Sequence, residues 1–91
     1  MNQELPLSYR RVQYMESCFD MLRLAFETDP SLCTDPVFRA CLNILQQYYH
    51  GELWLKDYQL DEAGFFPRIL KRGVLSQDGV YNFLVSLEKM I

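Results

Sequence analysis

The fold is decided by residues that end and start helices within the stretch WLKDYQLDEAGFFPRILKRGVLSQDGVY, residues Trp54–Tyr81. Acidic residues dominate its first part, basic residues follow, and a final amphipathic segment comes after a break. Glycine readily follows the end of a helix because it adopts positive φ at no steric cost. The stretch therefore predicts a helix over 52–62 that Gly64 closes. A short helical turn over 67–72 and a last helix over 76–90 complete it.

The start of the last helix has three local signals. Gly73 is predicted to stop the preceding turn, and Ser76 is placed as an N-cap because its hydroxyl can accept a hydrogen bond from a free backbone amide. Leu75 and Val80 have the spacing of a hydrophobic staple across that cap. Together these residues predict a defined end of the helical turn, followed by a defined start of the last helix.

Upstream of this stretch, apolar residues recur at steps of three and four, which is the period of one helix face. They are Val12, Met15, Phe19, Leu22 and Phe26. A polar stripe with the same spacing is expected to face water, and it consists of Gln13, Glu16, Asp20, Arg23 and Glu27. Ser8 is the expected N-cap. The pattern predicts a helix over 8–28, which Pro30 prevents from continuing.

A second helix is predicted over 35–49, with Asp35 as its N-cap and Pro36 in its first position. It has two adjacent apolar stripes, which are Val37, Cys41, Ile44 and Tyr48, and Phe38, Leu42, Leu45 and Tyr49. So broad an apolar face must be covered from more than one side. The first helix covers part of it in an antiparallel hairpin, and either the C-terminal helices or a second copy of the chain covers the rest.

No alternating strand pattern competes with these helices, so the predicted fold class is all-α. The expected architecture is an antiparallel helical hairpin capped by two shorter C-terminal helices, a small helical bundle. At 91 residues the chain is of the size of one domain, 1–91.

Composition excludes some classes of partner. Twelve acidic residues against nine basic ones give a net charge of −3, which disfavours binding to nucleic acid. No apolar run approaches the roughly 20 residues of a membrane helix. The cysteines are odd in number and lack metal-site spacing, as expected for free thiols in a reducing compartment; they are Cys18, Cys33 and Cys41. We therefore expect a cytoplasmic protein that binds neither nucleic acid nor membrane.

The chain shows no set of catalytic residues. His50 is the only histidine, and it continues a polar stripe that points it at water. Asp57, Asp61 and Glu62 allow two interpretations. They can bind a hard cation in a metal-dependent enzyme or regulator, or form a structural charge cluster with the basic residues that follow, Arg68, Lys71 and Arg72. We expect the charge cluster, and no catalytic residue, metal or cofactor.

Four aromatic residues with polar tips lie close together in the sequence and flank two acids; the six residues are Tyr48, Tyr49, Glu52, Trp54, Asp57 and Tyr58. Such rings are typical of a protein-contact hot spot, and equally of a helix-junction core whose hydroxyls find local partners. The contact interpretation makes the chain a non-enzymatic protein–protein interaction module. Its expected partner is another protein, and self-association is a further possibility.

The string LKRGVLSQD at 70–78 resembles a family of short bacterial all-helical proteins known only as a domain of unknown function. The resemblance extends over further residues, which are Tyr48, Tyr49, Trp54, Asp57, the DEAG at 61–64, Pro67 and Tyr81. It departs at Gln77, where the family usually has Glu. The resemblance implies a bacterial, cytoplasmic, helical protein and no activity. In general character alone, without a shared motif, the chain is also similar to immunity proteins that neutralise a toxin nuclease.

Overall fold

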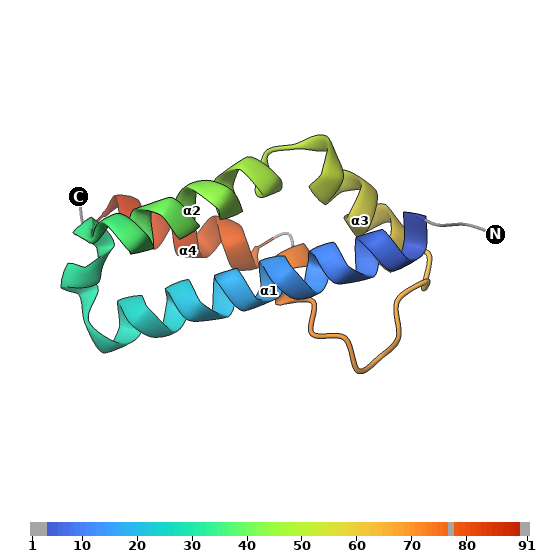
Figure 1. The fold of residues 1–91 in the computed structure, drawn as a ribbon, viewed down its shortest axis with the longest axis horizontal. Coiled ribbons are helices and arrows are strands. Elements are labelled where there is room, and N and C mark those ends of the chain that lie inside the picture. Colours follow the sequence, from blue (N-terminus) through green and yellow to red (C-terminus); the bar gives the residue numbers. More distant parts are fainter. Residues whose placement is uncertain (1–3, 77, 90–91) are drawn as a thin grey trace.

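The computed structural model describes residues 4–76 and 78–89. Its elements are α1 (Glu4–Thr28), η1 (Pro30–Thr34), α2 (Pro36–Tyr49), α3 (Glu52–Glu62), η2 (Gly73–Leu75) and α4 (Gly79–Glu88), where η denotes a 3-10 helix. The described residues form four α-helices and no strand, which confirms the predicted all-α bundle (Figure 1).

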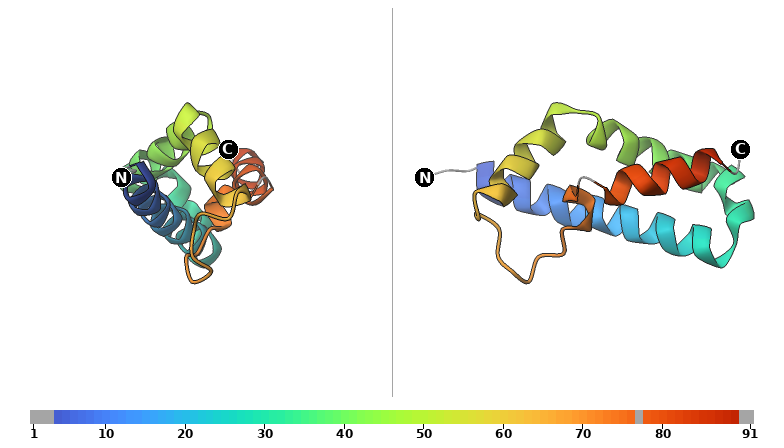
Figure 2. Two further views of the ribbon diagram at one scale, coloured as in Figure 1. Left: turned by 90° about the vertical axis from the view of Figure 1, so that its right-hand side faces the viewer. Right: turned by 180° about the vertical axis from the view of Figure 1, so that it is seen from behind.

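The helices form an elongated body of 46 × 24 × 22 Å. Helices α1 and α2 make an antiparallel hairpin that η1 connects, and α4 lies along one side of this hairpin in the direction of α1 (Figures 1 and 2). Helix α3 packs at the other end, beside the start of α1. The segment 63–72 loops away from the body before η2 returns to its middle.

Helix α1 begins at Glu4, one turn earlier than predicted. Pro6 does not prevent this, because the first turn of a helix has no intrahelical partners for its amides. Ser8 is therefore not an N-cap. It lies inside α1, fully buried, and its hydroxyl accepts a hydrogen bond from Arg11 Nη2 at 3.0 Å.

Helix α2 begins as predicted. The Asp35 carboxylate accepts hydrogen bonds from the amides of Val37 and Phe38, at 2.8 and 3.4 Å, which satisfies two amides of the first turn. Pro36 occupies the first helical position.

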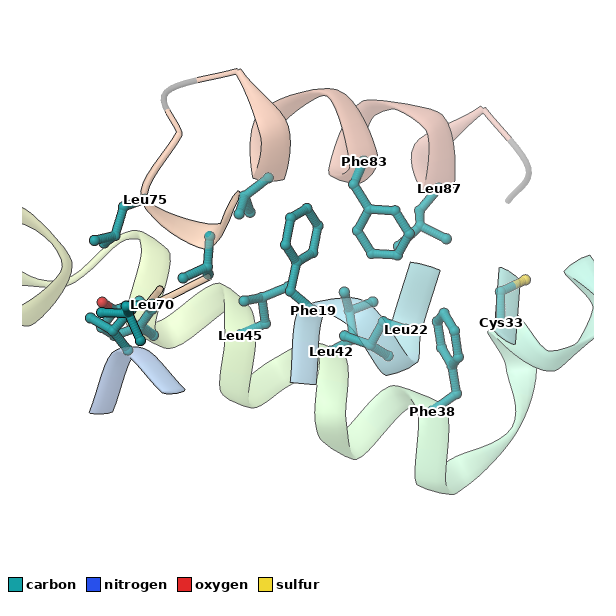
Figure 3. Packing of buried hydrophobic residues seen from close by; sticks show 14 of the residues in the cluster. Phe19, Leu22, Cys33, Phe38, Leu42, Leu45, Leu70, Leu75, Phe83 and Leu87 are labelled. Atoms are coloured by element: carbon teal, nitrogen blue, oxygen red, sulfur yellow. The ribbon is translucent and has the colours of Figure 1, made fainter. Parts of the chain in front are cut away.

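The core fills the space between α1, α2 and α4 (Figure 3). Phe83 of α4 packs edge-to-face on Phe19 and Phe26 of α1, with ring centroids 5.7 and 6.1 Å apart. The α2 residues Phe38, Leu42 and Leu45 are buried in the same core. The idea that a second copy covers this stripe of α2 is therefore wrong, because α1 and α4 of the same chain cover it.

The end of α3 has the geometry that Gly64 predicted. Gly64 adopts φ +80°, its amide donates to the Asp61 carbonyl, and the Phe65 amide donates to the Leu60 carbonyl. These two bonds define a Schellman motif, which satisfies carbonyls that the last turn of a helix leaves free. A short local signal is therefore enough to place this boundary.

The helical turn predicted over 67–72 does not form. A single turn closes between the Leu70 amide and the Pro67 carbonyl. The Arg72 guanidinium then holds the loop, since it donates to the Pro67 carbonyl at 2.7 Å and to the Leu70 carbonyl at 3.3 Å. Hydrogen bonds from the Arg72 side chain thus take the place of the backbone hydrogen bonds that a helix would have made.

Gly73 accordingly opens η2 and is not a helix stop. Helix α4 begins at Gly79, later than predicted, yet the Ser76 hydroxyl accepts a hydrogen bond from the Gly79 amide at 3.3 Å, as a capping serine does. Leu75 and Val80 are both buried in the core. The predicted end of the last helix at 90, with Gln77, Met90 and Ile91, lies outside the described residues.

Candidate functional site

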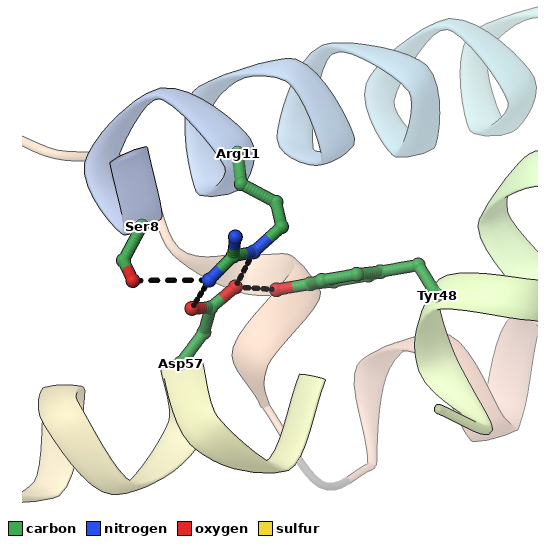
Figure 4. Close-up of polar contacts among 4 residues, drawn as sticks. All are labelled: Ser8, Arg11, Tyr48 and Asp57. Atoms are coloured by element: carbon green, nitrogen blue, oxygen red, sulfur yellow. Dashed lines mark hydrogen bonds and ion pairs between the residues drawn. The ribbon is translucent and has the colours of Figure 1, made fainter. Parts of the chain in front are cut away.

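A buried polar network joins three helices at the α3 end of the molecule (Figure 4). Asp57 of α3 is fully buried and accepts two hydrogen bonds from Arg11 of α1, at 2.8 Å from Nε and 2.6 Å from Nη2. The Tyr48 hydroxyl of α2 donates to Asp57 Oδ2 at 2.7 Å. Ser8 completes the network through Arg11. A charge inside a protein must be paired and hydrogen-bonded, and both conditions are met here.

The network fixes the protonation of Tyr48. Burial, together with the neighbouring Asp57 carboxylate, raises the pKa of Tyr48 far above its ordinary value. The phenol therefore stays a hydrogen-bond donor. Because the carboxylate is already occupied by a bidentate arginine and a phenol, the arrangement acts as a structural latch between α1, α2 and α3.

Tyr48 and Asp57 are thus not surface contacts. Both were candidates for binding another protein, but Tyr48 is only 5% exposed and Asp57 is 0% exposed. Sequence alone could not separate these two from their neighbours, because the partner that buries Asp57, Arg11, lies 46 residues away.

A second buried contact fixes η2. The Val74 amide donates to Glu16 Oε1 at 2.7 Å, and the Val74 carbonyl accepts a hydrogen bond from Trp54 Nε1 at 2.9 Å. Glu16 was predicted to face water with the polar stripe of its helix, but it is buried. The reason is that η2, returning 58 residues later, brings a backbone donor to it.

The predicted charge cluster forms only in part. Arg72 pairs with Asp61 at 2.5 Å, as expected. Lys71 instead pairs with Asp20 of α1, at 2.8 Å, and Asp57 pairs with Arg11. Glu62 and Arg68 are exposed. The acids therefore do not hold the C-terminal segment as one group, because α1 supplies the partner in two of these three ion pairs.

The described residues do not support the alternative interpretation of these acids as a metal site. Asp57 and Asp61 each have an arginine partner. Across residues 4–76 and 78–89, no three His, Cys, Asp or Glu side chains are grouped so that they could hold a metal ion.

The rings of Tyr49, Trp54 and Tyr58 form a ladder at the α2–α3 junction, which we call the aromatic ladder. Tyr49 meets Trp54 edge-to-face with centroids 5.3 Å apart, and Trp54 stacks on Tyr58 at 5.2 Å. All three side chains are half-buried. The hydrogen bond from Trp54 to Val74 fixes the middle ring, and all three rings keep part of their surface in contact with solvent.

A polar hollow of about 350 Å³ adjoins the end of this ladder. Its lining includes three acids and one base, and consists of Tyr58, Asp61, Glu62, Arg72, Leu75, Ser76 and Asp78. Partial burial and the carboxylates of Glu62 and Asp61 raise the pKa of Tyr58, so its hydroxyl remains protonated beside them. The hollow therefore combines an aromatic wall with an excess of negative charge.

A different hollow, of about 340 Å³, separates α1 from the 63–72 loop. Asp20 and Lys71 lie at its edge as an ion pair. Burial alone would raise the pKa of Asp20, but hydrogen bonds from Lys71 and Arg23 outweigh it and lower that pKa. Asp20 and Lys71 pair with each other and Glu16, which also lines the hollow, accepts the Val74 amide, so these charged groups are already engaged within the protein.

Comparison with protein families gives one match. The family described as a domain of unknown function, DUF4298, matches residues 35–91, which make up more than half of the chain. The chain belongs to this family. Searches of curated proteins and of solved structures found no match.

The family match extends the resemblance seen in the sequence, because it includes all of α2 as well as the 70–78 string. It covers the aromatic ladder, the polar hollow and Asp57, and leaves out α1. In the described part of the chain, no helix has the length and apolar character needed to cross a membrane.

Proposed function

We propose that this protein is a non-enzymatic module that binds a basic segment of another protein through the aromatic ladder and the adjoining polar hollow. One observation carries the proposal: the three half-buried rings of the aromatic ladder are in mutual contact, the Trp54–Val74 hydrogen bond fixes the middle ring, and Tyr58 at the end of the ladder lies beside Glu62 and Asp78. Aromatic rings that are already ordered lose little entropy on binding, and they supply large contact areas.

The charge around the ladder supports a cationic partner. Asp61, Glu62 and Asp78 outnumber Arg72 in the hollow, and Glu52 is exposed at the start of α3. Lysine and arginine side chains are attracted both by carboxylates and by the faces of Trp and Tyr rings. A basic segment lying along the ladder would use both attractions at once.

The experiment is a titration with the captured partner. The protein is cross-linked to its partner in cells of its native host, the bound segment is identified, and that segment is titrated against purified variants. We expect Glu62→Lys to weaken binding by about tenfold or more, because it places like charges together. Tyr58→Ala should also weaken it.

Glu88→Lys is the matched control, since it makes the same charge change on the exposed end of α4. It should leave the affinity unchanged. Equal affinity for wild type, Glu62→Lys and Tyr58→Ala would show that the ladder is not the binding surface.

The other functions that the sequence left open have weaker support. A metal-dependent enzyme or regulator requires Asp57, whose carboxylate is fully occupied by Arg11 and Tyr48. An immunity-type function is one special case of protein binding, and no geometric feature of the described residues singles it out.

A further inference from the structure

The face of the α1–α2 hairpin that lies opposite α4 is apolar. In Figure 1 this face is turned toward the viewer, and α4 lies behind it. We call it the outer hairpin face, and it consists of Tyr14, Cys18 and Met21 of α1 and Val37, Cys41 and Ile44 of α2. Val37 is 69% exposed and Tyr14 is 55% exposed, so a large part of this face meets solvent.

The two halves of the face are contiguous. Met21, Leu32 and Val37 line one apolar hollow of about 160 Å³ at the η1 end. Further along, Cys18 is close enough to interact with both Tyr14 and Cys41. Ile44 follows Cys41 by three residues and so lies on the same side of α2. The hairpin thus presents one continuous apolar strip, with Cys18 and Cys41 at its middle.

A charged residue lies at each end of this strip, and the two charges have opposite signs. Arg10 is exposed one helical turn before Tyr14, at the basic end. Asp35 borders the apolar hollow at the acidic end. Between them, the six residues of the outer hairpin face carry no charge.

We propose that two copies of this chain associate through their outer hairpin faces about a two-fold axis. A two-fold axis requires a surface that is complementary to itself. With the axis near Cys18 and Cys41, Arg10 lies roughly 12 Å from it along α1, at 1.5 Å per residue, and Asp35 lies about 9 Å from it along α2. These distances are similar and the directions are opposite. An axis that lies in the plane of the face and perpendicular to the helices therefore brings Arg10 of each copy to the end of the other copy at which Asp35 lies, over a central apolar contact.

This interface is independent of the proposed function. It uses α1 and α2 on the side away from α4, whereas the proposed binding surface lies at the α2–α3 junction and in the hollow beside α4. A dimer would carry two such binding surfaces, and either proposal can fail without the other.

Sedimentation velocity over a wide range of protein concentrations tests the proposal. Wild type is expected to sediment as a dimer at high concentration and to dissociate on dilution. Val37→Glu should raise the dissociation constant by about tenfold or more, because dimerisation would then remove a charged side chain from water into the apolar contact. Its melting temperature reports whether the monomer is intact, and the high exposure of Val37 predicts that it is.

Leu55→Glu provides the control. Like Val37, Leu55 of α3 is apolar and exposed, with an exposed fraction of 50%, but it lies outside the outer hairpin face. It should not change the dissociation constant. A wild type that is monomeric at all concentrations overturns the proposal. So does a dimer that Leu55→Glu disrupts and Val37→Glu does not.

The charged ends give a second readout. Asp35→Asn keeps an oxygen that can cap α2 but removes the charge. Together with Arg10→Gln, it should weaken the dimer and reduce the dependence of its dissociation constant on salt. An unchanged salt dependence would exclude the proposed antiparallel orientation.

Discussion

At the scale of single residues, Asp57 is the side chain on which most of the polar geometry depends. It is fully buried, and its two oxygens accept three hydrogen bonds from α1 and α2. Every buried side-chain nitrogen or oxygen in the described part of the chain has a hydrogen-bond partner. Removing one member of such a network leaves the others buried without partners, which costs more than the bond itself contributes.

The hydrogen bond from Tyr48 predicts a specific alkaline behaviour. Folding raises the pKa of Tyr48. The contribution of Tyr48 to the free energy of unfolding is therefore fully present below the pKa of about 10 that tyrosine has in the unfolded chain. Above that pH the unfolded chain loses the proton first. The free-energy difference between wild type and Tyr48→Phe should then shrink by about 1.4 kcal/mol per pH unit.

Urea unfolding at several pH values measures this difference. Near pH 7 we expect Tyr48→Phe to be less stable by about 1–3 kcal/mol, because Asp57 loses a buried donor. Since Tyr48→Phe retains every other tyrosine and lysine, their titration cancels in the comparison. A difference that stays constant from pH 8 to pH 11 would contradict the geometry.

The Arg11–Asp57 pair gives a prediction about coupling. Arg11→Met alone leaves a buried carboxylate without its cation and should cost about 3–5 kcal/mol. The double variant Arg11→Met, Asp57→Leu removes both charges and replaces them with apolar groups. We expect it to be more stable than either single variant, and guanidinium unfolding of all four proteins gives the coupling energy. Additive losses would mean that the pair does not interact energetically.

The sequence predicts the short-range contacts of individual residues and misses the long-range ones. Asp35 and Gly64 act on amides and carbonyls within five residues, so local patterns identified them. Asp57 and Glu16 bind partners 46 and 58 residues away, and no local pattern encodes such a distance. The same limit explains why buried and exposed aromatic residues near Trp54 could not be distinguished.

At the scale of elements, boundaries follow the sequence where a cap is present and shift where a distant contact intervenes. α2 has a capping aspartate and begins at the expected residue. The 67–72 segment has helix-forming residues, but the carbonyls that a helix would use internally are bound by the Arg72 side chain. Arg72 is itself held by Asp61 of α3, so the loop conformation depends on another element.

Gly64 provides a test of the boundary between α3 and this loop. Its φ of +80° is strained for any residue with a side chain, although no neighbouring atom would meet an added Cβ. Gly64→Ala should therefore cost about 1 kcal/mol through backbone strain alone. Gly64→Asn should cost less, because asparagine tolerates the left-handed region.

Thermal unfolding of the three proteins gives this order, with glycine most stable, asparagine intermediate and alanine least stable. An alanine variant as stable as wild type would mean that the loop adopts another conformation in solution. The order of the two variants separates strain from any effect of bulk, since asparagine is the larger residue.

At the scale of the whole molecule, two of the three acids that could bind a metal, Asp57 and Asp61, are engaged with arginines. We therefore expect the melting temperature to stay constant when millimolar Mg²⁺, Mn²⁺ or Ca²⁺ is added. A cation present at one hundred times its dissociation constant would stabilise the fold by about 2.7 kcal/mol, which is readily measured. A shift that Asp61→Asn or Glu62→Gln abolishes would restore the metal-dependent interpretation.

The family match raises a question about the fold, because it leaves out α1. The matched segment contains the buried carboxylate of Asp57 and the buried amide of Val74, and both take their partners from α1, through Arg11 and Glu16. Core residues such as Phe19 and Leu22 also come from α1. The matched segment therefore cannot satisfy its own buried groups.

We predict that a fragment of residues 35–91 is largely unfolded, with weak helical circular dichroism and no cooperative melting. Adding a peptide of residues 1–34 should restore helicity by supplying the missing partners. A peptide carrying Arg11→Met and Glu16→Met should restore much less, whereas one carrying Arg23→Met, which removes an exposed charge on the same helix, should act like wild type. A fragment that folds cooperatively alone would show that α1 is dispensable, and that its buried contacts follow from the fold without determining it.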